Sequence, residues 1–450
     1  MVRLNVTEVA REGKVNRFHM WMLFWCCVII TFDSFDLIVY SSIIPSIIGE
    51  WGISTVEVGA IGSYGFFGMM IGAILFGMVA DKFGRKNVLL FCVGLFSVFA
   101  FLLSFATGPV MFGIFRFISG VGIGGVLPNV LALLSDYSPK HKANLMVAIM
   151  MSCFSIGGII AGFVGMYFIP NLGWHSVYWV AIIPALFLPI MAKYFVDSPE
   201  SLLKKGKLEE LRKVVIQSNP TLSITSNTEF FNEERKESNL PAVALFKNKL
   251  AVGTVMIWIA FFMCLLMING INTWLPNLMF SAGYELGSSL SFVIVFNLGA
   301  IFGTLIFGGL IDRFGLKQVL VPAFILSAVF LTLLGFKNSM WILYLLVFAA
   351  GACTMGAQNI SYSFVSQYYP AHIRATGVGF ASAVARIGGI IGPTFGGILV
   401  YLNISFQMNF IAFAIPGIFA GLAFLLIPFK NGAGNMKSQN MKKEVVEELV

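Results

Sequence analysis

Long apolar stretches follow one another along almost the whole chain, and short polar or charged segments separate them. A helix needs about 20 mostly apolar residues to cross a membrane, which matches these stretches. Continuous apolar runs also differ from the short alternating segments of a membrane β-barrel. The pattern predicts twelve spanning helices, at residues 20–45, 55–79, 87–107, 110–135, 143–169, 174–196, 250–275, 286–311, 317–336, 340–365, 373–401 and 406–428.

One long polar segment divides the twelve predicted spans into two sets of six, and a second follows the last span. Within the first segment, residues 199–217 show helical periodicity, which predicts short surface helices. We therefore expect an all-α integral membrane protein with two pseudo-symmetric six-helix halves. The expected parts are an N-terminal segment at 1–19, a bundle at 20–196, a linker loop at 197–249, a bundle at 250–428 and a tail at 429–450.

The composition supports a membrane protein and excludes several other classes. Hydrophobic residues make up 58% of the chain and charged residues only 11%, whereas soluble domains contain about 25% charged residues. A soluble enzyme, a disordered chain and a nucleic-acid-binding domain are therefore excluded. All six cysteines fall inside predicted spans without C-x-x-C spacing, so we expect no metal site, no disulfide framework and no cofactor.

The basic residues predict the orientation in the membrane, because cytoplasmic loops carry an excess of Lys and Arg. These residues lie in the N-terminal segment, in the loops after even-numbered spans and in the tail. The opposite loops contain a single basic residue, Lys337. Both termini are therefore expected in the cytoplasm. The net charge of +8 then reflects topology, and no nucleic-acid partner is needed to explain it. The first span is too long for a signal peptide and contains two aspartates.

A charged motif occurs once in each half. Residues 77–86 read GMVADKFGRK after the second span, and residues 308–317 read GGLIDRFGLK after the eighth. Gly84 and Gly315 permit a tight turn. A repeat at equivalent points of two halves is typical of transporters whose halves move around a central site.

With these features, the sequence resembles the major facilitator superfamily over essentially its whole length. The resemblance is carried by the span-4 segment Arg116–Gly125, by Gly157-Gly158 and Ala161-Gly162 in span 5, and by segments 136–139 and 369–377. The resemblance implies a cytoplasmic gate built from the charged residues of these loops. Its predicted members are Asp81, Arg85, Asp136, Asp312, Arg313 and Arg374.

A narrower resemblance is to the aromatic acid:proton symporter family. Residues 33–36 read DSFD and are similar to that family's Asp-Gly-x-Asp motif, with Ser34 in place of the usual glycine. Residues 273–276 (TWLP) and 385–388 (ARIG) also resemble it. Carriers of nicotinate and other organic acids have similar paired acids, so they remain an alternative.

Four charged residues lie inside predicted spans: Asp33, Asp36, Arg116 and Arg386. Each costs about 2.5–3.5 kcal/mol to insert, so they must face one another or a wet cavity. Protonation of one aspartate leaves the set at +1, which suits a monoanionic carboxylate. Arginine binds both oxygens of such a group. We expect the aspartates to couple the proton and the arginines to bind substrate. The alternative is a set of permanent ion pairs, most of all for Arg116.

The two aspartates are three residues apart and share a helix face with Tyr40. Repulsion and burial favour the protonated form of one of them, whereas nearby arginines act in the opposite direction. We expect Asp36 to exchange the proton, and Asp33 to support the fold if it neutralises Arg116. Further predicted substrate contacts are the polar and aromatic span residues Tyr40, Asn272, Trp274, Gln358 and Tyr362. Helix packing is the alternative for each of these.

The sequence thus predicts a proton-coupled symporter that imports a small aromatic carboxylate such as benzoate or 4-hydroxybenzoate by alternating access. The alternative cargo is nicotinate or a non-aromatic organic acid. A membrane enzyme would show a metal cluster or a nucleophile–base pair in the spans, and none is evident. The expected partners are a small organic anion, protons and the lipid bilayer of a bacterial cell membrane, with the protein acting as a monomer.

Overall fold

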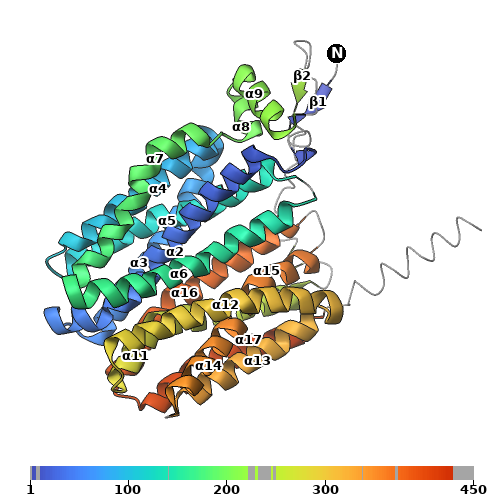
Figure 1. The fold of residues 1–450 in the computed structure, drawn as a ribbon. Helices are drawn as coiled ribbons and strands as arrows, with labels where there is room; N and C mark the ends of the chain where they lie inside the picture. Colours follow the sequence, from blue (N-terminus) through green and yellow to red (C-terminus); the bar gives the residue numbers. More distant parts are fainter. Residues whose placement is uncertain are drawn as a thin grey trace, which may run out of the picture. The chain divides into compact units, whose positions relative to one another are not determined.

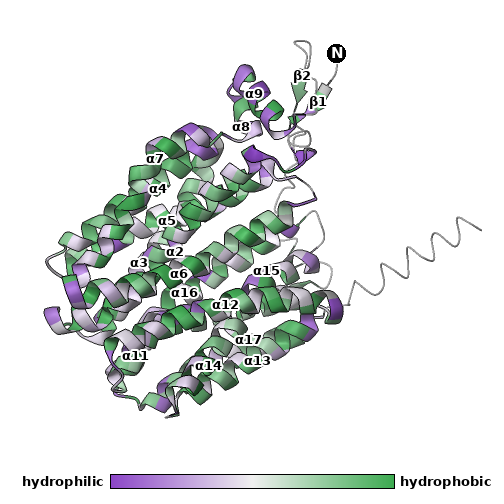
Figure 2. Cartoon of the chain, viewed as in Figure 1, coloured by the Kyte–Doolittle hydropathy of each residue, from purple (hydrophilic) through white to green (hydrophobic). Residues whose placement is uncertain are grey.

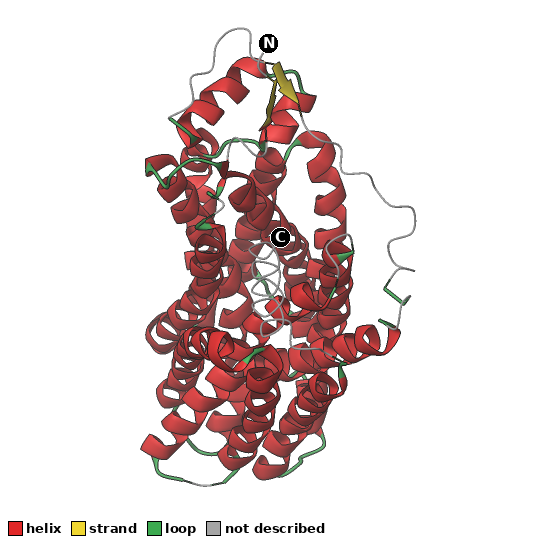
Figure 3. Cartoon of the chain, turned by 90° about the vertical axis from the view of Figure 1, so that its right-hand side faces the viewer, coloured by secondary structure: helices red, strands yellow, loops and turns green. Residues whose placement is uncertain are grey.

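In the part of the chain that it describes, the computed structural model is built almost entirely of helices, with one pair of short strands (Figures 1 and 3). The structure describes residues 3–6, 11–139, 141–220, 229–231, 245–246, 250–336, 338–369 and 373–428, without the side chains of 81, 144, 312 and 375. Twelve helices in this part of the chain are long and apolar enough to cross a membrane. The predicted fold class and number of spans are confirmed, and the helix bounds differ from those expected by a few residues. Figure 2 shows the apolar character along the helices.

The chain forms two compact units. Unit 1 comprises Met1–Glu237, Asn269–Asn297 and Ile390–Ile404, and unit 2 comprises Ser238–Ile268, Leu298–Gly389 and Ser405–Val450. Three long helices of the second half contribute to both units.

Unit 1 contains the first six spans. Helix α3 packs along α5, α2 packs along α6, and α4 packs along α5. The sixth span begins as a 3-10 helix and continues as an α-helix. The elements are α2 (Arg17–Trp51), α3 (Thr55–Phe83), α4 (Arg85–Leu102) with η1 (Leu103–Phe105), α5 (Pro109–Tyr137), α6 (Ala143–Leu172), η2 (Trp174–Ile182) and α7 (Ile183–Tyr194).

The other six spans include one helix that is interrupted. A π-helical segment, η3, lies between α14 and α15 in the tenth span. In unit 2, α13 packs against α17, where the rings of Phe324 and Phe424 stack with centroids 5.4 Å apart. The elements are α11 (Ala251–Ser281), α12 (Leu286–Phe314), α13 (Leu316–Leu334), α14 (Met340–Gly351), η3 (Ala352–Gly356), α15 (Ala357–Tyr368), α16 (Arg374–Tyr401) and α17 (Phe406–Leu426).

The linker contains the short helices expected from its periodicity. Helix α8 (Pro199–Lys204) and helix α9 (Leu208–Ser218) follow the sixth span. Leu211 and Val215 of α9 are buried in the same apolar cluster as Met22 of α2. A small parallel sheet pairs β1 (Arg3–Asn5) with β2 (Glu229–Phe231). The amphipathic face of α9 therefore packs as part of unit 1.

The repeated charged motif adopts the same backbone conformation in both halves. Gly84 has φ +88° between α3 and α4, and Gly315 has φ +90° between α12 and α13. Residues with a Cβ rarely adopt this left-handed region. The two motif glycines thus occupy equivalent tight turns, as the repeat predicts.

Candidate functional site

A buried ion pair joins α2 to α5 in unit 1. Nη1 of Arg116 lies 3.2 Å from Oδ2 of Asp36 and donates to the Asp36 carbonyl oxygen at 2.7 Å. Nη2 donates to the carbonyl oxygen of Leu37 at 3.3 Å. The two charged side chains are each only 2% exposed. Arg116 is thus held by the backbone of α2 as well as by the carboxylate.

Two further side chains complete the surroundings of this pair. The hydroxyl of Ser119 donates to the same Oδ2 of Asp36 at 3.1 Å. The guanidinium carbon of Arg116 lies 5.0 Å from the ring centroid of Tyr40, which is within range of a cation–π interaction. The Tyr40 hydroxyl itself donates to the Val58 carbonyl oxygen at 2.6 Å. Tyr40 therefore serves as packing support for the arginine in this structure.

Among the described residues, only one of the two carboxylate oxygens of Asp36 has hydrogen-bond partners. Arg116 and Ser119 both contact Oδ2. Among the described residues, Oδ1 of Asp36 has no hydrogen-bond partner. Asp33, one turn earlier on α2, is also buried, with 3% exposure. Both acids of α2 are thus buried, and the acid that pairs with Arg116 is Asp36 and not Asp33.

Glycines bring α3 and α5 into backbone contact beside the ion pair. A Cβ added to Gly120 would lie 2.2 Å from the Gly65 carbonyl oxygen, and one added to Gly68 would meet the Phe117 carbonyl oxygen at 2.3 Å. Small residues allow such close helix packing in membranes. Since Arg116 lies one turn before Gly120, this packing determines where its guanidinium lies.

Three of the predicted substrate residues lie close together in unit 2. The Tyr362 hydroxyl lies beside Ser382 and Gln358, and it interacts electrostatically with Arg386. The Tyr362 ring packs edge-on against the Phe261 ring, and the two ring centroids are 5.1 Å apart. Arg386 on α16 is partly exposed, whereas Arg116 is sealed. Of the two span arginines, Arg386 is therefore the more accessible.

Two further predicted substrate residues, Trp274 and Asn272, belong to unit 1, as Arg116 and Tyr40 do. Trp274 is fully buried, and its indole nitrogen donates to the Pro393 carbonyl oxygen at 2.8 Å. Asn272 is partly buried on the same helix, α11. In this structure Trp274 therefore serves helix packing.

The predicted gate residues are only partly brought together. Arg85 and Asp136 form an ion pair at 2.6 Å between the start of α4 and the end of α5. Arg313 and Arg374 are exposed. The side chains of Asp81 and Asp312 lie outside the described residues.

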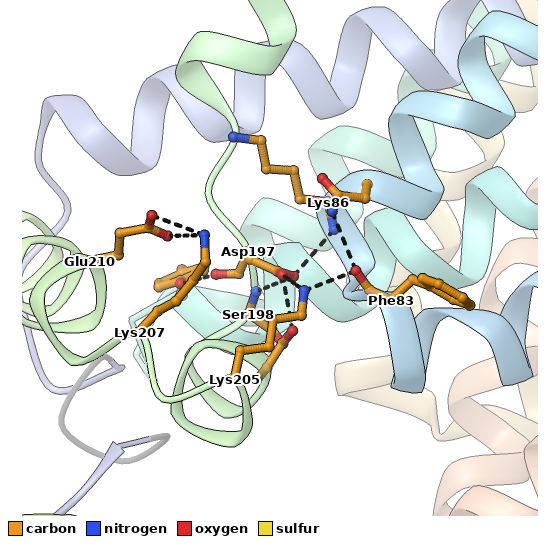
Figure 4. Close-up of polar contacts among 10 residues, drawn as sticks. Phe83, Lys86, Asp197, Ser198, Lys205, Lys207 and Glu210 are labelled. Atoms are coloured by element: carbon orange, nitrogen blue, oxygen red, sulfur yellow. Dashed lines mark hydrogen bonds and ion pairs between the residues drawn. The ribbon is translucent and has the colours of Figure 1, made fainter.

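A polar cluster that the sequence did not reveal lies just after the sixth span (Figure 4). Oδ2 of Asp197 accepts from the Lys205 ammonium at 2.8 Å and from the Ser201 hydroxyl at 2.9 Å. Lys205 also donates to the Phe83 carbonyl oxygen at 2.8 Å. Burial raises the pKa of Asp197, but the hydrogen bonds from Lys205 and Ser201 outweigh it and hold the pKa below its usual value. The sequence signal that could have revealed this cluster is Asp197 itself, an acidic residue between the sixth span and a lysine-rich helical segment.

This cluster fixes α8 to the turn that carries the repeated motif. A Cβ added to Gly84 would lie 2.1 Å from Oδ2 of Asp197 and 2.4 Å from Nζ of Lys205. Glycine is therefore required at this turn for two reasons, its backbone conformation and the carboxylate beside it.

The arrangement of twelve spans, a repeated motif turn and buried span charges defines a membrane transporter. The chain matches the family described as Major Facilitator Superfamily over residues 25–303 and 286–446, and it belongs to that family. A D-xylose-proton symporter of known structure has the same fold, with a TM-score of 0.72, 16% identity and coverage of 92% of this chain and 99% of that chain. The prediction of a transporter, and not an enzyme, is confirmed by the family.

Curated relatives match along nearly the whole chain. The benzoate transport protein of Acinetobacter baylyi is 36% identical over 94% of this chain and 92% of its own length. The gentisate transporter of Corynebacterium glutamicum is 34% identical over 90% and 86%. The gallate transporter of Pseudomonas putida is 31% identical over 94% of each chain. The resemblance to aromatic acid transporters that the motifs indicated is confirmed.

Proposed function

We propose that this protein is a proton-coupled symporter that imports a small aromatic carboxylate, such as benzoate or 4-hydroxybenzoate, by alternating access. The observation that carries this proposal is the one-sided satisfaction of Asp36. Arg116 and Ser119 contact only Oδ2, which leaves Oδ1 to take up a proton. A carboxylate that can change its charge without losing its neighbours suits proton coupling.

The relatives support the class of cargo. Proteins named as benzoate, gentisate and gallate transporters align with 90% or more of this chain at 31–36% identity. Each of these named compounds is an aromatic carboxylate. A niacin transporter from Acinetobacter baylyi is 28% identical over 89% of the chain, so nicotinate is the second candidate.

The two span arginines take different roles in this proposal. Arg386 is partly exposed and lies near the Tyr362 hydroxyl, so we assign it to the substrate carboxylate. Its planar fork can donate two parallel hydrogen bonds to both oxygens. Arg116 is sealed and already donates to two backbone carbonyls. We therefore assign Arg116 to proton coupling. It stabilises the charged form of Asp36, and this electrostatic attraction is lost when Asp36 takes up a proton.

The transport cycle proposed here needs no covalent step. A proton neutralises Asp36, which leaves the four span charges at a net +1, and a monoanionic acid binds to Arg386. Release of the acid and the proton to the cytoplasm then completes import. We propose that residues 20–196 and 250–428 act as the moving bundles and that residues 197–249 connect them. In the same proposal, one copy of the chain suffices.

The proposed cytoplasmic gate uses the Arg85–Asp136 pair at its core, together with Arg313, Arg374 and the motif acids Asp81 and Asp312. The excess of basic residues in these loops supports a cytoplasmic location for this end of the protein and for both termini, in a bacterial cell. The protein would then lie in the cytoplasmic membrane.

An uptake screen in proteoliposomes tests the proposal. Labelled benzoate, 4-hydroxybenzoate, nicotinate and an aliphatic acid are offered with an imposed pH gradient, acidic outside. We expect accumulation of at least one aromatic acid above its equilibrium level, abolished by a protonophore. Saturable uptake that does not depend on the pH gradient would reject proton coupling. Uptake of the aliphatic acid alone would reject the aromatic cargo.

A further inference from the structure

Two of the six cysteines lie side by side in unit 1, across the interface between the first and fifth spans. Cys27 is on α2 and Cys153 is on α6, and a hydrogen bond joins their thiol groups. Beside them, the Thr31 hydroxyl of α2 donates to the Cys153 carbonyl oxygen at 3.4 Å. Both cysteines are free thiols in this structure. Nothing in the proposed transport cycle uses this pair.

The packing of the two helices holds the pair together. Helices α2 and α6 pack along each other, and a Cβ added to Gly157 of α6 would lie 2.1 Å from the Thr31 carbonyl oxygen of α2. Thr31 follows Cys27 by four residues, and Gly157 follows Cys153 by four residues, which is about one helical turn in each case. The backbone contact at Gly157 therefore sets the two cysteines opposite each other one turn earlier.

The other four cysteines have different surroundings. They are buried, and within the described part of the chain none of them forms a hydrogen bond to another thiol: Cys26, Cys92, Cys264 and Cys353. Cys27 is the one cysteine of the chain that is not buried. Buried structural thiols are inert, whereas a thiol that combines access with a neighbouring thiol has a partner to react with.

Two neighbouring thiols can form a disulfide, a bond of about 2.05 Å that lies within reach of side chains already in hydrogen-bond contact. Hydrogen peroxide first oxidises the Cys27 thiol to a sulfenic acid, which breaks the O–O bond and releases one water. The Cys153 sulfur then attacks the Cys27 sulfur, and a second water leaves as the S–S bond forms. In total the two thiols lose two electrons and two protons, and the peroxide is reduced to two waters.

We propose that Cys27 and Cys153 form a redox-active dithiol, a modification site that hydrogen peroxide oxidises to a disulfide between α2 and α6. The pair lies inside two apolar spans, so its oxidant must be small and uncharged, as hydrogen peroxide is. Oxidation starts at Cys27 because it is the more exposed of the two sulfurs. The bond fastens α2, which carries Asp36, to α6. Disulfides of proteins in reducing compartments are usually transient and redox-sensing. This inference does not depend on the proposed function.

The test uses the purified full chain in proteoliposomes treated with hydrogen peroxide. Remaining free thiols are alkylated, the protein is digested without reduction, and the peptides are identified by mass spectrometry. We expect a linked pair of peptides that contains Cys27 and Cys153 and has lost two hydrogen atoms, from protein that still migrates as a single chain. The link should disappear after reduction with dithiothreitol, and it should be absent from Cys27→Ala and from Cys153→Ala.

Cys26→Ala is the matched control, because it removes the adjacent buried thiol, and it should leave the link unchanged. Oxidation of Cys27 to a sulfinic or sulfonic acid without a link would overturn the inference, and so would two thiols that both stay reduced. These outcomes are read from the natural chain, so they decide whether or not any variant folds. A link that persists in Cys27→Ala, or that is lost in Cys26→Ala, would overturn the inference too.

Discussion

Nη1 of Arg116 contacts Asp36 twice, at the backbone carbonyl oxygen (2.7 Å) and at the carboxylate (3.2 Å). The first contact does not depend on the charge of the side chain. Arg116 can therefore keep its position on α2 when Asp36 is neutralised. The pair is built so that its electrostatic attraction can change while its geometry is retained.

The first prediction concerns this pair. Asp36→Asn mimics the protonated aspartate permanently, so uphill accumulation driven by a pH gradient should be abolished. Exchange of internal for external substrate should survive in part, because that half-cycle requires no proton release. Gradient-driven uptake and counterflow are measured in the same vesicles, with protein level checked. Continued accumulation against the substrate gradient would disprove the coupling role of Asp36.

The free energy of unfolding of variants at the same pair is a control, because it separates a loss of coupling from a loss of stability. Removing one partner of a buried ion pair costs about 3–5 kcal/mol. The Asn side chain and the retained carbonyl contacts should bring Asp36→Asn to the low end of that range. Ser119→Ala removes one hydrogen bond and should cost only about 1 kcal/mol, with coupling preserved. Thermal unfolding of the purified variants distinguishes these effects.

The second prediction concerns substrate binding. Arg386→Lys keeps the charge but loses the planar fork. Loss of one hydrogen bond to a charged group, about 1.5–3 kcal/mol, corresponds to roughly a 10- to 150-fold higher KM for the acid. Arg212→Lys, on the linker helix α9, should leave KM unchanged. An unaltered KM in Arg386→Lys for every transported acid would assign Arg386 to structure.

The third prediction concerns the motif turn. Gly84→Ala places a Cβ 2.1 Å from the Asp197 carboxylate, in a backbone conformation that itself costs about 1–2 kcal/mol for other residues. Gly173 has a similar conformation, with φ +80° and nothing within 4 Å of an added Cβ. Gly173→Ala should therefore show the backbone cost alone, and Gly84→Ala about 1–3 kcal/mol more. Equal melting temperatures would refute the close contact with Asp197.

The fourth prediction concerns pH. The folded-state pKa of Asp197 lies below its usual value because Lys205 and Ser201 offset the effect of burial. Its contribution to stability is thus complete above the unfolded-state pKa of about 3.9 and is lost as pH falls through the folded value. The Tm difference between the natural chain and Asp197→Asn should shrink steadily below about pH 4. A difference independent of pH between 3 and 7 would contradict the ionised state.

The fifth prediction concerns orientation. In a background without the six native cysteines, a cysteine at Lys213, on α9, should react with a membrane-impermeant reagent only after the cells are opened. A cysteine at Thr107, between the third and fourth spans, should react on intact cells. Both positions are exposed. The reverse pattern would invert the orientation given by the basic loops.

The sequence by itself determined the twelve spans, the internal repeat and the identity of the residues that carry charge into the membrane. Apolar length and polar interruptions follow directly from the cost of placing polar groups in lipid. The glycines of the repeated motif, Gly84 and Gly315, could be assigned to tight turns because glycine adopts backbone conformations that other residues rarely adopt. None of these features depends on which helix packs against which.

The tertiary structure decided which side chains meet. Asp33 and Asp36 are equivalent in the sequence pattern, and the packing of α5 against α2 and α3 brings Arg116 to Asp36. Gln358 and Asn359 are adjacent amides, but Asn359 reaches Thr304 on α12, whereas Gln358 lies beside the Tyr362 hydroxyl. Asp197 reaches the Gly84 turn from more than a hundred residues away. Pairing of this kind depends on helix register and side-chain reach across space, which a linear pattern does not contain.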